Sequence, residues 1–182
     1  MKHEVFTNEL HMVRDENIRS LVKDCLNQAP DYFYKIPASS TGKYHPAYSL
    51  GEGGLVRHTK AAVRIAYDLL QLEQNRQLPH DEIIVALILH DSVKHGFEYS
   101  KYVQAEHPKH AAELLIKMAS NQTGNNVMKV FTIRNLILTH MGEWNKCYKT
   151  KREVLPKPVS VAQEFVHMCD YLASRKHITV EL

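Results

Sequence analysis

One uninterrupted apolar run constrains the fold of this chain more than any other feature. Residues 83–89 read IIVALIL, and the run ends directly in His90-Asp91. A helix this apolar has to be buried, so other helices must pack around it. It is also far shorter than the roughly 18 apolar residues that a membrane span needs. We therefore expect a helical bundle that places an imidazole and a carboxylate where a buried helix ends.

The rest of the chain shows apolar residues at helical spacing between clear breaks. The breaks are Pro30, the Gly- and Pro-rich stretch 37–54, SNQTGNN and the basic stretch GEWNKCYKTKREVLPKP. Helices are expected at about residues 14–28, 55–70, 81–90, 108–118, 126–141 and 160–175. No segment shows the alternation of a convincing strand. The predicted fold is all-α, a compact helical bundle of about six to eight helices.

Length and composition predict a single domain in a reducing compartment. The domain covers residues 1–182, with 1–36 as an N-terminal helical extension and 37–175 as the core. A net charge of +3 excludes a chain that binds nucleic acid over its whole surface, although a local basic groove stays open. Three scattered cysteines without a CxxC pair and a polar N-terminal segment predict a cytoplasmic protein without a membrane segment. The oligomeric state is left open, with a homo-oligomer as one alternative.

Histidine is the unusual residue of this composition, with 12 copies. Six potential metal ligands fall at helix ends or on apolar faces: His58, His90, Asp91, His107, His140 and Asp170. A lone histidine at a helix end is more often an ordinary hydrogen-bonded residue, but helical bundles build metal sites from several such inward-facing side chains. Imidazoles and carboxylates without a thiolate suit Mn, Fe, Co, Ni or Zn. We therefore expect one or two divalent transition metals.

The order of these residues resembles the HD superfamily of metal-dependent phosphohydrolases. LILHDSVKHG is similar to the family's apolar helix followed by HD-x-x-K-x-G, and GGLVRHT is similar to its first-histidine motif. PASSTGKYHPAYSLGEGGLVRHT and LILTHMGEW look closest to the branch of HD domains found with 3′–5′ exoribonucleases and in some relaxases. The resemblance covers roughly residues 37–175 and implies an HD-type bundle with a metal-binding core.

The resemblance also implies how the six ligands are shared. The first metal would be held by His58, His90, Asp91 and Asp170. The second would be held by Asp91, His107 and His140, with Asp91 as the bridge. This branch often has two consecutive histidines where the present chain has His140-Met141, so whether the second position is occupied is left open. His110, one helical turn after His107, is expected to support the site or to lie at the surface.

The resemblance and the loops suggest which residues meet a substrate. Asp91 and Lys94 are expected to be catalytic, with the lysine reaching a phosphate oxygen; the alternative for Lys94 is a solvated lysine at a helix end. The expected substrate-binding residues are Ser40, Thr41, Lys43, His45 and Trp144. Hydroxyls and cations next to the first ligand form a plausible phosphate clamp, and Trp144 is a candidate for stacking on a base. The alternatives are a connector rich in turns and a hydrophobic lid.

The function expected from the resemblance is a metal-dependent phosphohydrolase. It would cleave a phosphate ester or phosphodiester of a nucleotide or short single-stranded oligonucleotide by metal-activated water. One alternative is an HD-type di-iron oxygenase, which tightly bound iron and O₂-dependent turnover would favour. Another is a non-catalytic HD binding module, although intact residues at all six ligand positions argue against it. The sequence does not identify the exact substrate or the metal.

Overall fold

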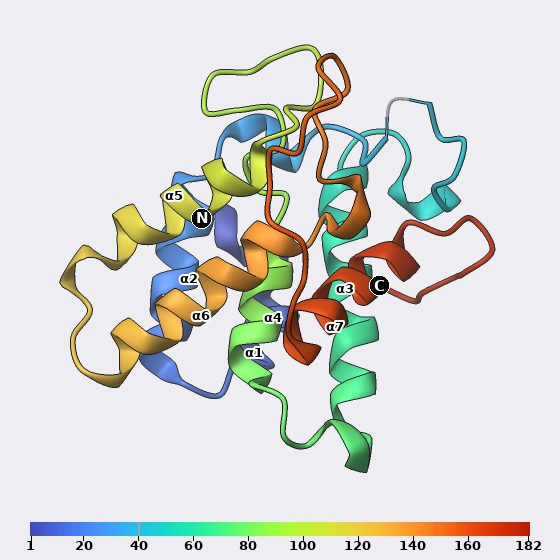
Figure 1. Ribbon diagram of the computed structural model, residues 1–182. Helices are drawn as coiled ribbons and strands as arrows, with labels where there is room; N and C mark the ends of the chain where they lie inside the picture. Colours follow the sequence, from blue (N-terminus) through green and yellow to red (C-terminus); the bar gives the residue numbers. More distant parts are fainter. Residues whose placement is uncertain (40) are drawn as a thin grey trace.

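The computed structural model describes residues 1–39 and 41–182, and this part of the chain is an all-helical bundle (Figure 1). Its seven α-helices are α1 (Thr7–His11), α2 (Glu16–Gln28), α3 (Gly54–Leu70), α4 (His80–Leu89), α5 (His107–Met118), α6 (Asn125–Thr139) and α7 (Val161–Ala173). The described residues contain one isolated β-bridge, between Lys146 and Glu153, and no strand. The prediction of an all-α bundle is confirmed.

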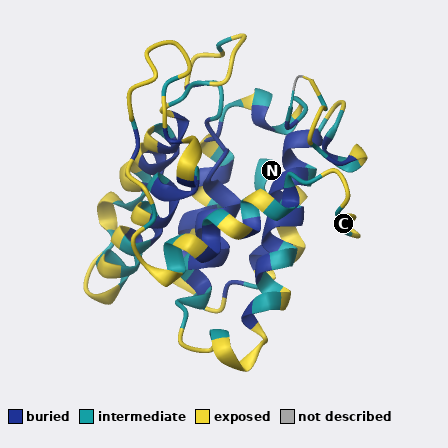
Figure 2. Ribbon diagram, turned by 45° about the vertical axis from the view of Figure 1, so that its right-hand side comes forward, coloured by how far each residue is buried: buried dark blue, intermediate teal, exposed yellow. Residues whose placement is uncertain are grey.

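The apolar run of α4 lies at the centre of the bundle. Every residue from Ile83 to Leu89 is at most 1% exposed. Helices α2, α3, α6 and α7 pack against α4, so its whole circumference is covered. In Figure 2 buried residues fill the middle of the molecule, and exposed residues mark the outer helix faces and the loops. A helix without a polar face can be stable only in this position, because any exposed face would leave hydrocarbon in water.

Local capping explains where two of the helices begin. The Asp15 side chain accepts hydrogen bonds from the backbone N–H groups of Asn17 and Ile18 and thereby caps α2. Ser160 and Gln163 form a reciprocal capping box at the start of α7. All six expected helices begin and end within a few residues of observed ones. The short helix α1 has no counterpart among the expected helices, because a segment of five residues carries too little periodicity to detect.

The long connector before α3 is held tightly against the start of that helix. A side chain at Gly54 would collide with the backbone of Ser49, so only glycine permits this close approach. The Arg57 guanidinium donates to the carbonyl oxygens of Tyr48, Leu50 and Glu52 and ties the connector down. These contacts determine where α3 begins, and therefore where His58 lies in its first turns.

Two further findings concern the length of the apolar helices and the state of the cysteines. Among the described residues, no helix combines the length and the apolar character that crossing a bilayer would take. Cys25, Cys147 and Cys169 are all free thiols.

Candidate metal centre

The six predicted ligands come together at one end of the bundle, and five helices supply them. His58 lies in α3, His107 is the first residue of α5, and Asp170 lies in α7. The pair His90-Asp91 follows α4 directly, and His140 follows α6 directly. All except Asp170 are buried, and the Asp170 side chain is only 19% exposed. Helix ends that meet in space therefore bring together residues separated by more than a hundred positions.

The ligand atoms form a continuous network. His58 Nε2 lies 2.9 Å from Asp170 Oδ1, and His90 Nε2 lies 3.4 Å from the same oxygen. Asp91 reaches both sides of the cluster. Its Oδ2 lies 3.5 Å from His90 Nε2, and its Oδ1 lies 3.0 Å from His107 Nε2. His107 Nε2 is in turn 3.3 Å from Nε2 of His140. The carboxylate of Asp91 thus links His90 on one side of the cluster to His107 on the other.

Three overlapping groups of ligand atoms are compact enough to hold an ion. Within each group the atoms lie no more than 4.8 Å apart; the groups are His58–His90–Asp91, His90–His140–Asp170 and Asp91–His107–His140. The third group is the set that the resemblance implied for a second metal. The other two together contain the four residues implied for the first. They also bring His140 next to His90 and Asp170, which the sequence did not indicate.

Backbone carbonyl groups orient three of the imidazoles. The Nδ1 atoms of His90, His107 and His140 lie 2.7, 2.8 and 2.8 Å from the carbonyl oxygens of Leu87, Gln104 and Ile137. A carbonyl can only accept, so each Nδ1 donates, and Nε2 is the atom directed at the cluster. His90 Nε2 is buried and makes no well-formed hydrogen bond within the described part of the chain, although carboxylate oxygens lie 3.4 and 3.5 Å from it. A buried nitrogen left in this state fits a site that receives a cation.

Electrostatics keeps both carboxylates charged in spite of their burial. Burial alone would raise the pKa of Asp91, but Lys94, His90 and His107 outweigh it and hold the pKa well below its usual range. Burial likewise opposes ionisation of Asp170, and His90 and His58 outweigh it, so that pKa is also well below its usual range. The cluster therefore contains two buried negative charges that attract a cation.

The pKa values of His90 and His140 are shifted in opposite directions. Burial acts to lower the pKa of His90, but Asp91 and Asp170 outweigh it and raise the pKa to about 9. Burial, reinforced by His90 and His107, lowers the pKa of His140 to about 3. A proton on His90 thus neutralises the carboxylates in the metal-free protein. A divalent cation would supply more positive charge at the same place and displace that proton.

A cavity of about 170 Å³ opens beside the ligands and is lined in part by predicted substrate residues. His45, Lys94 and Trp144 line it, with Trp144 half exposed at its mouth. The Lys94 ammonium lies 2.6 Å from Asp91 Oδ2 and therefore binds the proposed bridge directly. Thr41 and Lys43 are exposed and do not line this cavity. Ser40 lies outside the described residues.

Several cavity residues were not identified from the sequence. Arg175 lines the cavity just beyond α7, where its guanidinium lies 4.2 Å from the centre of the Tyr171 ring and 5.8 Å from that of Tyr44. Tyr171 in turn stacks on Trp144, with ring centres 5.5 Å apart. The spacing of Tyr171 and Arg175, one and five positions after Asp170, is the one signal that would have pointed to them. The four-residue separation of Tyr171 and Arg175 places these two side chains next to each other, as their contact shows.

Two other histidines contribute indirectly. His167 Nδ1 donates to the carbonyl oxygen of His140, at 2.7 Å, and a side chain at Gly142 would collide with the His167 ring. This contact positions the chain immediately after α6. His110 lies 2.7 Å from the side-chain oxygen of Gln104, whose backbone carbonyl orients His107. His110 therefore supports the site through Gln104 and belongs to none of the three ligand groups.

Comparisons with known proteins identify no relative of this chain. No family model matches it, and neither a curated protein nor a solved structure does.

Proposed function

We propose that this protein is a metal-dependent phosphohydrolase of the HD type that cleaves a phosphate ester or phosphodiester of a nucleotide or short oligonucleotide. The observation that carries the proposal is the buried cluster itself, in which five helices bring four histidines and two aspartates together around Asp91. Oriented imidazoles, two ionised carboxylates and a buried nitrogen without a well-formed hydrogen bond are the features of a transition-metal site.

The proposed site holds two ions that share one carboxylate. His58, His90, Asp91 and Asp170 would hold the first, and Asp91, His107 and His140 the second. When bound, such ions supply an activated water and neutralise the charge that builds on phosphorus. A donor set of nitrogen and oxygen without sulfur suits Mn, Fe, Co, Ni or Zn.

The remaining cavity residues favour an anionic substrate. Lys94 and Arg175 bring two cations to a small cavity next to the carboxylates. Among the described residues Arg175 pairs with no carboxylate. Its guanidinium stacks on Tyr171 and donates two hydrogen bonds to Ser174 Oγ, and its other N–H groups are left for a phosphate. Burial, with His58 and Lys94, lowers the pKa of His45 to about 4, so this ring is a neutral hydrogen-bonding group at pH 7.

The size of the cavity limits what can enter it. Pockets that enclose a drug-sized ligand usually measure about 300–1,000 Å³. A cavity of about 170 Å³ accommodates a phosphate group with its attached oxygens but not a whole nucleotide. The sugar and base would therefore lie at the mouth of the cavity, where Trp144 and Tyr171 stack.

The first test is elemental analysis of the purified protein together with the variant Asp91→Asn. The expected result is bound transition metal in the wild-type protein, loss of that metal in the variant, and metal-dependent hydrolysis of bis-(para-nitrophenyl) phosphate by the wild-type protein alone. Asp24→Asn on the exposed face of α2 is the matched control and should keep both properties. Full metal content in Asp91→Asn, or no metal after reconstitution with Mn, Fe, Co or Ni, would overturn the proposal.

A further inference from the structure

A second, larger groove lies directly beside the metal cavity. It measures about 710 Å³ and runs between the loop that leads into α5 and the loop that follows Trp144. In Figures 1 and 2 these two loops stand next to each other at the same end of the molecule. Val103 lines both the groove and the metal cavity. The two spaces therefore share a wall, and a ligand that leaves the cavity on this side meets the groove.

Hydrogen bonds hold both walls of the groove in shape. In the second loop the Cys147 N–H donates to Arg152 O at 2.9 Å, and the Val154 N–H donates to Asn145 O at 2.9 Å, which makes a short hairpin. In the first loop the Gln104 N–H donates to Lys94 O at 3.1 Å. This contact attaches the wall of the groove directly to a residue of the metal cavity. The groove is thus a built feature with fixed spacing from the site.

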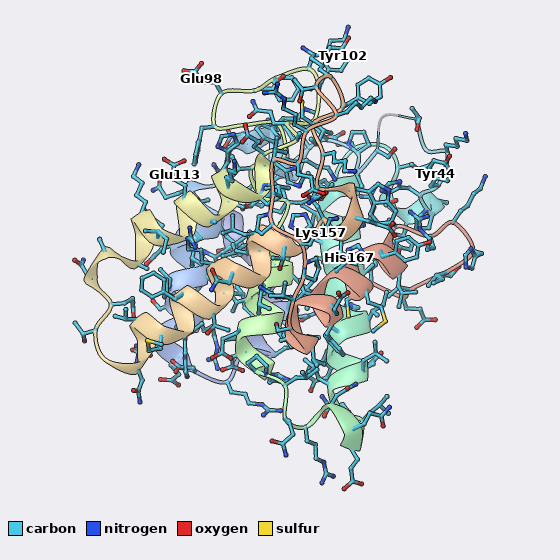
Figure 3. The ribbon with its side chains drawn as sticks, viewed as in Figure 1. Tyr44, Glu98, Tyr102, Glu113, Lys157 and His167 are labelled. Carbon is cyan, nitrogen blue, oxygen red and sulfur yellow. The ribbon has the colours of Figure 1, made fainter. Side chains whose placement is uncertain are left out.

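The surface of the groove is aromatic and positively charged. Tyr102 and Tyr148 line it and are 72% and 85% exposed. Figure 3 shows Tyr102 projecting outward from the end of its loop. Five exposed cations of the two loops form no ion pair within the described residues: Lys101, Lys146, Lys149, Lys151 and Arg152. The nearby acids Glu106 and Glu153 are instead paired with Lys109 and Lys157. Of these five, Lys149 lines the groove itself, and Lys101 and Lys151 lie over the rings of Tyr102 and Tyr148. The rim of the groove therefore carries unneutralised positive charge.

We infer that this groove binds the nucleotides next to the scissile phosphate of a single-stranded oligonucleotide, which rests on the proposed function. The cavity receives the phosphate, and the groove has the volume for a nucleotide that the cavity lacks. Exposed tyrosines stack on any base, and unpaired lysines neutralise the phosphate backbone. Double-stranded nucleic acid presents no free base face to stack on Tyr102 or Tyr148. The combination of aromatic and basic residues therefore selects a single strand.

Binding is tested without turnover. Fluorescence anisotropy of a labelled hexathymidylate is measured on the full chain in EDTA, so that no metal is present to support cleavage. The expected result is binding that weakens as salt rises between roughly 50 and 200 mM. Tyr148→Ala should weaken it by about fivefold or more, and Lys149→Ala should lower the slope against the logarithm of salt by about 0.7. Lys117→Ala, at the opposite end of α5 from His107, is the matched control.

Two outcomes would overturn the inference. One is equal affinity of the wild-type protein, Tyr148→Ala and Lys149→Ala for the oligonucleotide. The other is binding of a hexaglutamate peptide as tight as that of the oligonucleotide and insensitive to Tyr148→Ala. In that case the groove is a docking surface for an acidic protein segment.

Turnover measurements distinguish the role of the groove from that of the metal site. The ratio of kcat/KM for the hexathymidylate to kcat/KM for bis-(para-nitrophenyl) phosphate is measured with the reconstituted protein. This ratio should fall about tenfold in a Tyr102→Ala/Tyr148→Ala variant and stay the same in Lys117→Ala. If the small diester is cleaved and the oligonucleotide is not preferred, the inference about the groove is overturned and the proposed function stands. If the wild-type protein cleaves neither substrate but still binds the oligonucleotide in EDTA, the proposed function is overturned instead.

Discussion

The ammonium of Lys94 lies 2.6 Å from Oδ2 of Asp91, the carboxylate at the centre of the proposed metal site. Both side chains are largely buried, so this ion pair is shielded from solvent. A carboxylate oxygen bound in this way is also the oxygen that faces His90. Lys94 therefore stabilises the charged form of Asp91, and a metal ion must share that oxygen with it.

Replacing Lys94 should separate catalysis from metal binding. In Lys94→Met we expect tighter metal binding, because the variant removes a cation that competes for Asp91. We also expect kcat/KM to fall roughly 100-fold, because the cation proposed to bind the substrate phosphate is lost. Metal titration and steady-state kinetics measure the two effects. Weaker metal binding in this variant would mean that Lys94 organises the site and does not compete with the ion.

Asp170 and Asp91 should differ in how much metal their loss removes. In the proposed assignment Asp170 holds only the first ion and Asp91 holds both, so Asp170→Asn should keep the Asp91–His107–His140 position. We expect this variant to bind about one ion fewer than the wild-type protein and Asp91→Asn to bind none. Elemental analysis of both variants after identical reconstitution distinguishes them. Equal metal loss in the two variants would show that the ions bind only as a pair.

Met141 lies on the cavity wall immediately after His140. A histidine here would add an imidazole close to the Asp91–His107–His140 group. Met141→His should therefore tighten binding at the second position, which isothermal titration with Mn or Co would detect as a gain in the weaker of two affinities. Unchanged affinity and stoichiometry would show that the new side chain does not reach the ion.

Arg175 is the cavity cation that the sequence did not indicate. Arg175→Ala should raise KM for phosphate substrates about tenfold or more and leave metal content unchanged, because the guanidinium contacts no proposed ligand. Arg175→Lys should restore only part of the loss, since lysine lacks the paired donors that match a phosphate. A loss of metal in Arg175→Ala would instead assign Arg175 to the structure of the site.

The stability of the metal-free protein should peak near pH 6.5. The pKa of His90 is raised to about 9, so its contribution is complete below the unfolded value of about 6.5 and is lost as the pH rises toward 9. His140 and His45 have pKa values lowered to about 3 and about 4. As the pH falls below about 6.5, the unfolded chain binds protons at these two positions that the folded protein does not, so stability falls again.

Stability should change more steeply with pH on the acid side than on the alkaline side, because two histidines contribute on the acid side and one on the alkaline side. The depressed pKa values of Asp91 and Asp170 add to the loss only below the unfolded carboxylate value of about 4. Thermal unfolding in EDTA from pH 5 to pH 9, followed by circular dichroism, measures the profile. A melting temperature that is constant across this range would contradict the assignment of charges in the cluster.

The sequence by itself determined the six longer helices and the identity of the six residues that cluster. Apolar periodicity is a local property, and an apolar run such as that of α4 leaves burial as the only stable outcome. The six ligands were recognisable because each lies at a helix end or on an apolar face, which are positions that a bundle directs inward. None of this required knowing which helices are neighbours.

Only the tertiary structure decided the distances between these residues and the additional neighbours of His140. The packing of α4, α6 and α7 brings the His140 ring to 4.8 Å from that of His90 and into one ligand group with Asp170. The same packing brings Arg175 into the cavity and leaves Thr41 and Lys43 outside it. It also sets the loop before α5 beside the loop after Trp144. Loop positions follow from the helices that anchor them, and loop composition carries no record of that geometry.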